Sequence, residues 1–174
     1  DGSFDAVFSC LNLHWVDDLL GLMVQIRKLL RPDGLCLINL LGGNSLFELR
    51  AALLGAEQDV TGRFSPRCAP MADIKDVGGL LGRAGLALPV ADSDRLTVTY
   101  SNMFRLMADL RGMGEQNAML GRLRQPTRRA VFMRAAEIYQ TKFGRDDGTI
   151  PASFEIITLT GWAPHESQQK PLRP

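Results

Sequence analysis

The sequence predicts an α/β fold with a doubly wound sheet, and three observations support this prediction. Residues 4–11 form an almost uninterrupted apolar run, which is typical of a strand covered on both faces in a parallel sheet. Residues 35–41 form a second such run, and the segment between them has helical spacing, so the order is strand, helix, strand. With 174 residues, 45% of them hydrophobic, the chain is long enough to bury a core.

The helix between the two strands is predicted from residue 17 onward. Apolar residues recur at helical spacing from Leu19 to Leu30, and Asp17 and its neighbour place acids in the first turn. Pro32 and Gly34 follow and should end the helix before the second strand begins.

The remaining elements follow from the same periodicities. We expect helices over residues 45–54, 73–83, 103–110 and 127–143, and strands over residues 86–90, 95–100 and 154–162. Ser45 or Asn44 should cap the first of these helices. In the helix over residues 103–110, Phe104, Met107 and Leu110 share a face.

Composition excludes several functions. A net charge of +1, with basic and acidic residues interspersed, provides no stripe that would attract nucleic acid or an anionic membrane. Cys10, Cys36 and Cys68 are too dispersed for a disulfide framework or a zinc site. No apolar run approaches the roughly 20 residues that span a bilayer, and no signal peptide is visible. These features predict a soluble intracellular protein without a transmembrane segment.

Polar and aromatic side chains follow the first predicted strand. Asn12, His14 and Trp15 occupy the position where open parallel sheets bind ligands, beyond the carboxyl end of a strand. The alternative is that His14 and Trp15 only cap the core. Spacing by itself leaves both interpretations open.

Longer motifs carry a family resemblance. "FDAVFSCLNLHWVDDL" followed by "IRKLLRPDG" resembles the fourth strand, the next helix and the fifth strand of class I S-adenosylmethionine-dependent methyltransferases. The segments "GGNSLFELR", "FSPRCAP", "DVGGLLGRAG", "MFRLMADLRGMGE", "DDGTIPASFEI" and "GWAPHESQ" are together similar to the family of mitochondrial complex I assembly factor 5 and its bacterial relatives. Malonyl carrier-protein methyltransferases of biotin synthesis are more distantly similar. The resemblance runs from Asp1 to about Pro171.

The resemblance implies the C-terminal part of a Rossmann-like, doubly wound methyltransferase sheet, with lid helices inserted before the last strand. We expect residues 1–163 to form one partial domain, with lid helices at about 101–144 and a flexible tail over 164–174. The first three strands and the glycine-rich cofactor turn of the family have no counterpart in this sequence; "GGNS" follows the fifth strand. The chain by itself is therefore expected to be inactive, and residues 4–11 should form an apolar sheet edge through which it self-associates.

The resemblance also implies functional residues and S-adenosylmethionine as the cofactor. They are Cys10, Leu11 and Asn12 beside the cofactor, His14 and Asn12 in catalysis, and Trp15, Tyr100, Gly114 and Glu115 beside the substrate. No metal is expected, because His14 and His165 are the only two histidines and lie far apart in the sequence.

The implied function is that of a methyltransferase-family protein that modifies a protein substrate. The alternative is a respiratory complex I assembly factor that acts as an arginine hydroxylase, or as a non-catalytic module that docks on a respiratory-complex subunit. The implied location is the bacterial cytoplasm, with the periphery of the inner membrane as an option, or the mitochondrial matrix in a eukaryote.

Three further segments have two interpretations each. The glycines of "DLRGMGEQN" form either a lid hinge near the substrate or an ordinary helix stop. The methionines between Met103 and Met119 line either a partner groove or the core. The arginines between Arg122 and Arg129 form either a basic patch for an acidic carrier protein or subunit, or a solvated helix start.

Overall fold

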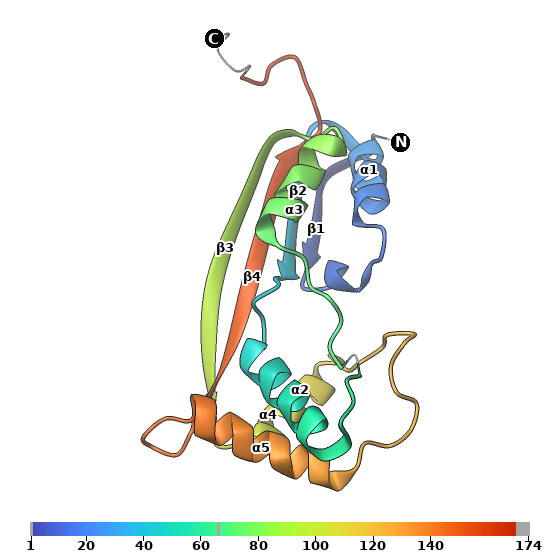
Figure 1. Ribbon diagram of the computed structural model, residues 1–174. Helices are drawn as coiled ribbons and strands as arrows, with labels where there is room; N and C mark the ends of the chain where they lie inside the picture. Colours follow the sequence, from blue (N-terminus) through green and yellow to red (C-terminus); the bar gives the residue numbers. More distant parts are fainter. Residues whose placement is uncertain (1, 66, 170–174) are drawn as a thin grey trace. The chain divides into compact units, whose positions relative to one another are not determined.

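The structure is a computed structural model that describes residues 2–65 and 67–169 and divides the chain into two compact units (Figure 1). The sheet unit comprises residues 1–43, 71–94 and 155–174, and the helical unit comprises residues 44–70 and 95–154. The elements in chain order are β1 (Phe4–Cys10), η1 (Leu13–Trp15), α1 (Leu19–Leu29), β2 (Leu30–Leu41), α2 (Phe47–Thr61), α3 (Ile74–Arg83), β3 (Ala87–Tyr100), α4 (Met103–Gly112), α5 (Arg129–Phe143) and β4 (Ile150–Trp162).

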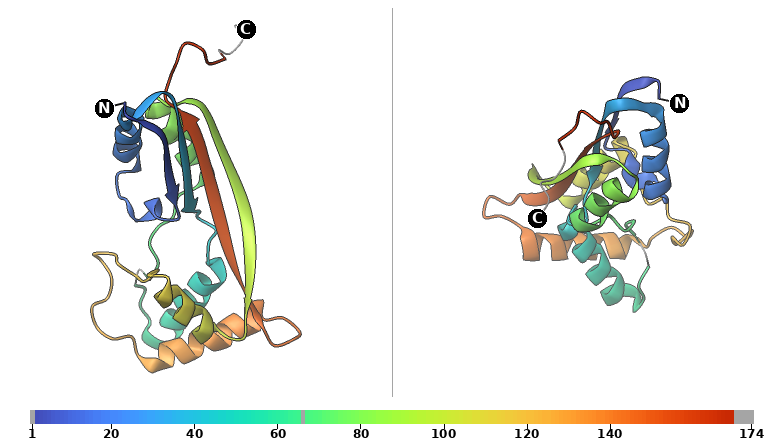
Figure 2. Two further views of the ribbon diagram at one scale, coloured as in Figure 1. Left: turned by 180° about the vertical axis from the view of Figure 1, so that it is seen from behind. Right: turned by 90° about the horizontal axis from the view of Figure 1, so that it is seen from above.

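The sheet has the strand order β1-β2-β4-β3, which Figure 2 shows from two further directions. β1 runs parallel to β2, and β2 runs antiparallel to β4. Cys10 lies opposite Asn39, so β1 and β2 reach their carboxyl ends at the same edge of the sheet. The predicted α/β fold is thus confirmed, with α1 as the connection between two parallel strands.

One face of the sheet carries the core of the sheet unit. Cys36, Ile38 and Leu40 alternate along β2, so their side chains point to the same face, and all three are fully buried. Met23 of α1 and Leu81 of α3 belong to the same buried cluster. The amphipathic α1 and α3 therefore cover this face.

β1 is an edge strand, as predicted. Within the described residues it has β2 as a neighbour on one side, and Phe8 is 63% exposed. The expectation that residues 4–11 are covered on both faces is wrong for the described part of the chain, because the residues of β1 are exposed or half-buried and none is fully buried.

α2 and α5 form the centre of the helical unit. Ala52 and Ala56 of α2 and Ala135 of α5 are fully buried, and small side chains let two helices approach closely. A Cβ atom on Gly55 would lie 3.4 Å from Cδ1 of Ile138. This close approach suits a glycine at position 55 inside α2, which extends to Thr61 and so beyond the predicted end at residue 54.

The start of α2 is held by a buried carboxylate rather than by the predicted caps. Leu46, with a φ of 53°, occupies the N-cap position without a side-chain hydrogen bond, so the expectation for Ser45 or Asn44 is wrong. The Ser153 hydroxyl donates to Glu48 at 2.6 Å and the Ser153 amide at 3.2 Å. The Leu46 amide donates to the Ser153 carbonyl at 2.6 Å, so the helix start is fixed to β4.

Other boundaries differ from the predictions. The strands expected over residues 86–90 and 95–100 form the single β3, β2 begins at Leu30, and β4 begins at Ile150 rather than at 154. Phe104 is exposed, and Met103 and Leu106 join Leu110 in the core instead.

The predicted N-terminus of α3 is confirmed. Asp73 accepts a hydrogen bond from the Lys75 amide at 2.9 Å, as an N-cap residue does. The expected tail is described up to Gln169, and Gln168 donates to Asp33 at 2.8 Å; residues 170–174 lie outside the described residues. One domain over residues 1–163 stays a prediction.

Candidate active site

The polar segment after β1 begins with a strained turn. The Leu11 amide donates to the Asn39 carbonyl at 2.9 Å, which continues the pairing with β2. Leu11 then adopts a φ of 48°, a left-handed conformation that costs a branched residue of this kind about 1 kcal/mol or more. Such strain is often found where a functional residue must be presented. Here it turns the chain so that Asn12 is exposed beyond the strand end.

The short helix η1 then anchors this segment. Leu13 is buried in the core of the sheet unit, while Trp15 is 40% exposed and His14 is partly buried. The rings of His14 and Trp15 lie 5.5 Å apart between centroids, and the Trp15 amide donates to the Asn12 carbonyl at 3.3 Å. An apolar anchor thus holds an amide, an imidazole and an indole at the carboxyl end of β1. Both interpretations of His14 and Trp15, as core caps or as ligand-site residues, stay predictions: the His14 side chain is partly buried, whereas Trp15 is exposed.

A carboxylate from β4, that of Glu155, lies beside the end of β2. The Gly42 amide donates to the Glu155 carbonyl at 2.8 Å, and a Cβ atom on Gly42 would lie 2.6 Å from a carboxylate oxygen of Glu155. The Ser93 hydroxyl donates to Glu155 at 3.0 Å. A side chain at position 42 would therefore displace the Glu155 carboxylate, which lies at the edge where β1 and β2 end. Sequence reasoning missed Glu155 because it treated the residue as part of a strand, although it is the one acid in "FEIITLTGW".

The segment after β1 fits part of a nucleoside cofactor. Leu11 offers an exposed apolar side chain, Asn12 an amide that can donate and accept, and Cys10 an exposed thiol. In the described residues, the turn after β1 holds no glycine. Cys10, Leu11 and Asn12 could thus line one side of the cofactor, whereas the backbone cradle of a glycine-rich turn is not formed by this segment.

The other predicted site residues belong to the helical unit. Tyr100 ends β3, and burial together with the nearby Asp109 carboxylate raises the pKa of its phenol. Gly114 has a φ of 83°, its amide donates to the Arg111 carbonyl, and the Glu115 amide donates to the Leu110 carbonyl at 2.9 Å. This is a Schellman motif, so the helix-stop interpretation is confirmed. A role of Gly114 and Glu115 in substrate binding stays a prediction.

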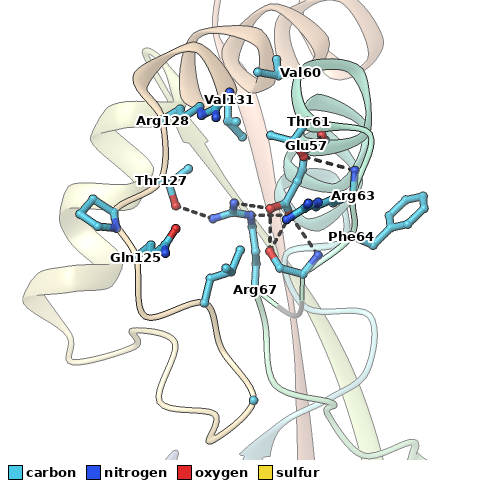
Figure 3. A pocket seen from close by; sticks show the side chains of 14 residues that line it. Glu57, Val60, Thr61, Arg63, Phe64, Arg67, Gln125, Thr127, Arg128 and Val131 are labelled. Atoms are coloured by element: carbon cyan, nitrogen blue, oxygen red, sulfur yellow. Dashed lines mark hydrogen bonds and ion pairs between the residues drawn. The ribbon is translucent and has the colours of Figure 1, made fainter.

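The helical unit contains a pocket of about 530 Å³ that sequence reasoning missed (Figure 3). Glu57 of α2 is 3% exposed and accepts from Nε of Arg67 at 3.0 Å and from Nη2 at 2.8 Å. The Ser65 hydroxyl donates to both Glu57 oxygens at 2.7 Å, and Nη1 of Arg67 donates to the Thr127 hydroxyl at 2.9 Å. Burial raises the pKa of Glu57, but the hydrogen bonds and charge of Arg67 and the bonds from Ser65 outweigh burial, so the pKa is lowered. Glu57 therefore stays ionised.

No sequence pattern joined these residues. Glu57 lies beyond the predicted end of its helix, "FSPRCAP" was interpreted only as a loop, and Thr127 lies 60 positions after Arg67. The available signal for this pocket was Glu57 itself, an acidic residue in the last turns of an amphipathic helix.

The methionine and arginine segments each contain residues that fit either of the two interpretations given above. Met103 is buried in the core, whereas Met113 is exposed. Arg122 donates to the carbonyls of Ala118 and Met119, at 3.4 and 2.9 Å, while Arg128 lines the pocket.

Among residues 2–65 and 67–169, no three histidine, cysteine, aspartate or glutamate side chains gather closely enough to hold a metal ion. In the same residues, no helix has the length and apolar character needed to cross a membrane.

Comparisons with known proteins agree on the family. A family model described as "Methyltransferase domain" matches residues 1–38. The mitochondrial arginine-hydroxylase NDUFAF5 of Dictyostelium discoideum is 46% identical over 174 residues, which cover 99% of this chain and 40% of that protein. The malonyl-[acyl-carrier protein] O-methyltransferase of Xylella fastidiosa is 37% identical over 164 residues, 94% of this chain and 53% of that protein.

Comparison with solved structures also finds a methyltransferase fold. A candidate methyltransferase from Bacillus halodurans superposes with a TM-score of 0.56 at 16% identity, over 95% of this chain and 66% of that one. The chain spans about half the length of the curated relatives it matches. The chain is therefore a relative of the class I S-adenosylmethionine-dependent methyltransferases, and among them of the arginine-hydroxylase NDUFAF5 proteins.

Proposed function

We propose that the chain belongs to a protein that uses S-adenosylmethionine to methylate a side chain of a protein substrate. The observation that carries this proposal is the edge where β1 and β2 end, at which Asn12, His14 and Trp15 follow a strained turn. Ligand sites in open α/β sheets lie at this position.

Each residue has a distinct role in the proposal. Cys10, Leu11 and Asn12 contact the cofactor, whose sulfonium supplies an activated methyl group when it is bound. Because the methyl group needs no further activation, His14 and Asn12 act by orienting the acceptor atom and by excluding water. His14 also accepts the proton that the acceptor releases. Trp15 offers an exposed aromatic face, which suits a cationic side chain such as arginine.

Tyr100, Gly114 and Glu115 are proposed to contact the substrate, with Glu115 as a carboxylate partner for an arginine guanidinium.

Hydroxylation of an arginine is the second candidate, because the relative that is 46% identical is named an arginine hydroxylase. The two chemistries give different products on the same substrate: methyl transfer adds CH₂ to the peptide, and hydroxylation adds one oxygen atom. Mass spectrometry of an arginine-containing peptide after incubation with the complete protein separates them. A third candidate, a non-catalytic module that docks on a respiratory-complex subunit, predicts neither product.

Cofactor binding is tested by isothermal titration calorimetry of the complete protein with S-adenosylmethionine. We expect saturable binding, and no heat at millimolar cofactor would refute the methyltransferase proposal in favour of the docking module. His14→Ala should lower turnover about tenfold or more while the melting temperature stays unchanged. His165→Ala is the matched control, because that histidine is exposed and its ring is hydrogen-bonded to Ser167, two residues away. If His14→Ala instead unfolds the protein, the core-cap interpretation holds.

Self-association through β1 is a further part of the proposal. Phe4 and Phe8 are exposed on this edge strand, and strand edges pair readily with a second copy. Solution scattering of the chain should show a dimer, and a monodisperse monomer would refute it. The proposed location is the bacterial cytoplasm, at the periphery of the inner membrane as an option, or the mitochondrial matrix in a eukaryote; the relative from Dictyostelium discoideum is mitochondrial.

A further inference from the structure

The pocket of the helical unit carries a surplus of positive charge. Its charged lining residues are Glu57, Arg63, Arg67 and Arg128, which is three guanidinium groups against one carboxylate. Uncharged polar groups complete one side, among them Gln125 and Thr127. A volume of about 530 Å³ lies within the range of small-molecule sites.

The Glu57–Arg67 pair accounts for one of the three positive charges. Arg67 is held by a bidentate contact to Glu57 and a third bond to Thr127, as Figure 3 shows, and its side chain is 18% exposed. This pair links α2 to the loop after it and to the segment before α5. It therefore builds the wall of the pocket, and the ionised Glu57 neutralises Arg67.

The other two arginines retain their charge for a ligand. Arg63 and Arg128 are exposed, and in the part of the chain that the structure describes neither has an ion pair. They reach the pocket from two separate segments, the loop after α2 and the residue before α5. The first turn of α5 holds no acidic residue and no side-chain cap, so the positive end of the helix dipole adds to the charge of Arg128.

Apolar side chains lie beside these charges. Val60 of α2 and Val131 of α5 line the pocket together with Leu123. The pocket thus offers paired guanidinium groups next to a small apolar surface, which suits an anion that carries an aliphatic portion.

We propose that this pocket binds a small organic oxyanion, a carboxylate or a phosphate, through Arg63 and Arg128. Guanidinium groups hold both kinds of oxyanion by charge-assisted hydrogen bonds. The site lies within the helical unit and goes beyond the proposed methyl transfer, because it uses none of the residues to which that reaction is assigned.

The proposal is tested with four probes on the 174-residue chain: hexanoate, hexyl phosphate, inorganic phosphate and hexanol. Amide chemical shifts locate binding, and calorimetry measures affinity. We expect hexanoate or hexyl phosphate to bind and to shift the amides of Ser65 and Thr127, and the stronger of the two identifies the preferred oxyanion. Hexanol should bind far more weakly because it has no charge.

Two double variants with the same change in net charge separate a built site from general surface charge. Arg63→Gln with Arg128→Gln should raise the Kd of the anionic probe about tenfold or more. Arg124→Gln with Arg129→Gln should leave it unchanged, because these exposed arginines do not line the pocket.

An equal loss in both double variants would overturn the proposal, as would hexanol binding as well as hexanoate or no anion binding at about 10 mM. Circular dichroism establishes that each variant folds. These binding experiments use no S-adenosylmethionine. A negative result would therefore refute the oxyanion site without refuting the proposed methyl transfer.

Discussion

Replacing Glu57 by glutamine should destabilise the helical unit by about 2–3 kcal/mol. Removing one partner of a buried ion pair costs about 3–5 kcal/mol, because the other charge stays in the protein without compensation. The expected cost lies just below that range, since Arg67 is 18% exposed and can bind water, and glutamine keeps one acceptor for Ser65.

Urea denaturation followed by circular dichroism measures this difference, and amide hydrogen exchange in α2 and α5 locates it. Glu137→Gln is the matched control, because Glu137 pairs with Arg134 at 3.1 Å on the surface and such pairs contribute little. The Glu57 effect must also depend on pH. The pKa of Glu57 is lowered in the folded protein, so its stabilisation is complete above the unfolded value of about 4.3 and is lost as the pH falls through the folded pKa. A difference below about 1 kcal/mol at neutral pH, or one that does not shrink below about pH 4, would refute the role given to the pair.

The remaining predictions concern the sheet unit. Met23→Ala should cost about 3 kcal/mol of unfolding free energy in urea, because a fully buried side chain leaves a cavity; a loss below about 1 kcal/mol would contradict the described core. Asp73→Ala should cost about 1 kcal/mol by the same measurement, since the Lys75 amide loses its cap, and Asp73→Asn should restore most of it. In the native protein at about pH 8, a disulfide reagent should modify the exposed Cys10 rapidly and Cys36 only after denaturation, because burial raises the pKa of the Cys36 thiol to about 11. Cys10→Ser should remove the rapid phase, and a rapid phase that persists would contradict the assignment.

The sequence by itself determined the elements whose local signals agree with their environment. The apolar run of β1, the periodicity of α1 and the start of α3 near Asp73 each depend on neighbouring residues in the chain, so pattern and propensity predict them. The position of Asn12 beyond a strand end followed from the same local reasoning.

Only the tertiary structure decided features that depend on residues distant in the sequence. α2 starts at a left-handed leucine because Ser153, 105 positions after Glu48, binds that carboxylate. The pocket of the helical unit forms only when Thr127 meets Arg67. The carboxylate of Glu155 lies beside Gly42 only because β4 pairs with β2. Such contacts arise when the chain closes long loops to bury apolar surface, and no local pattern records which polar groups then become neighbours.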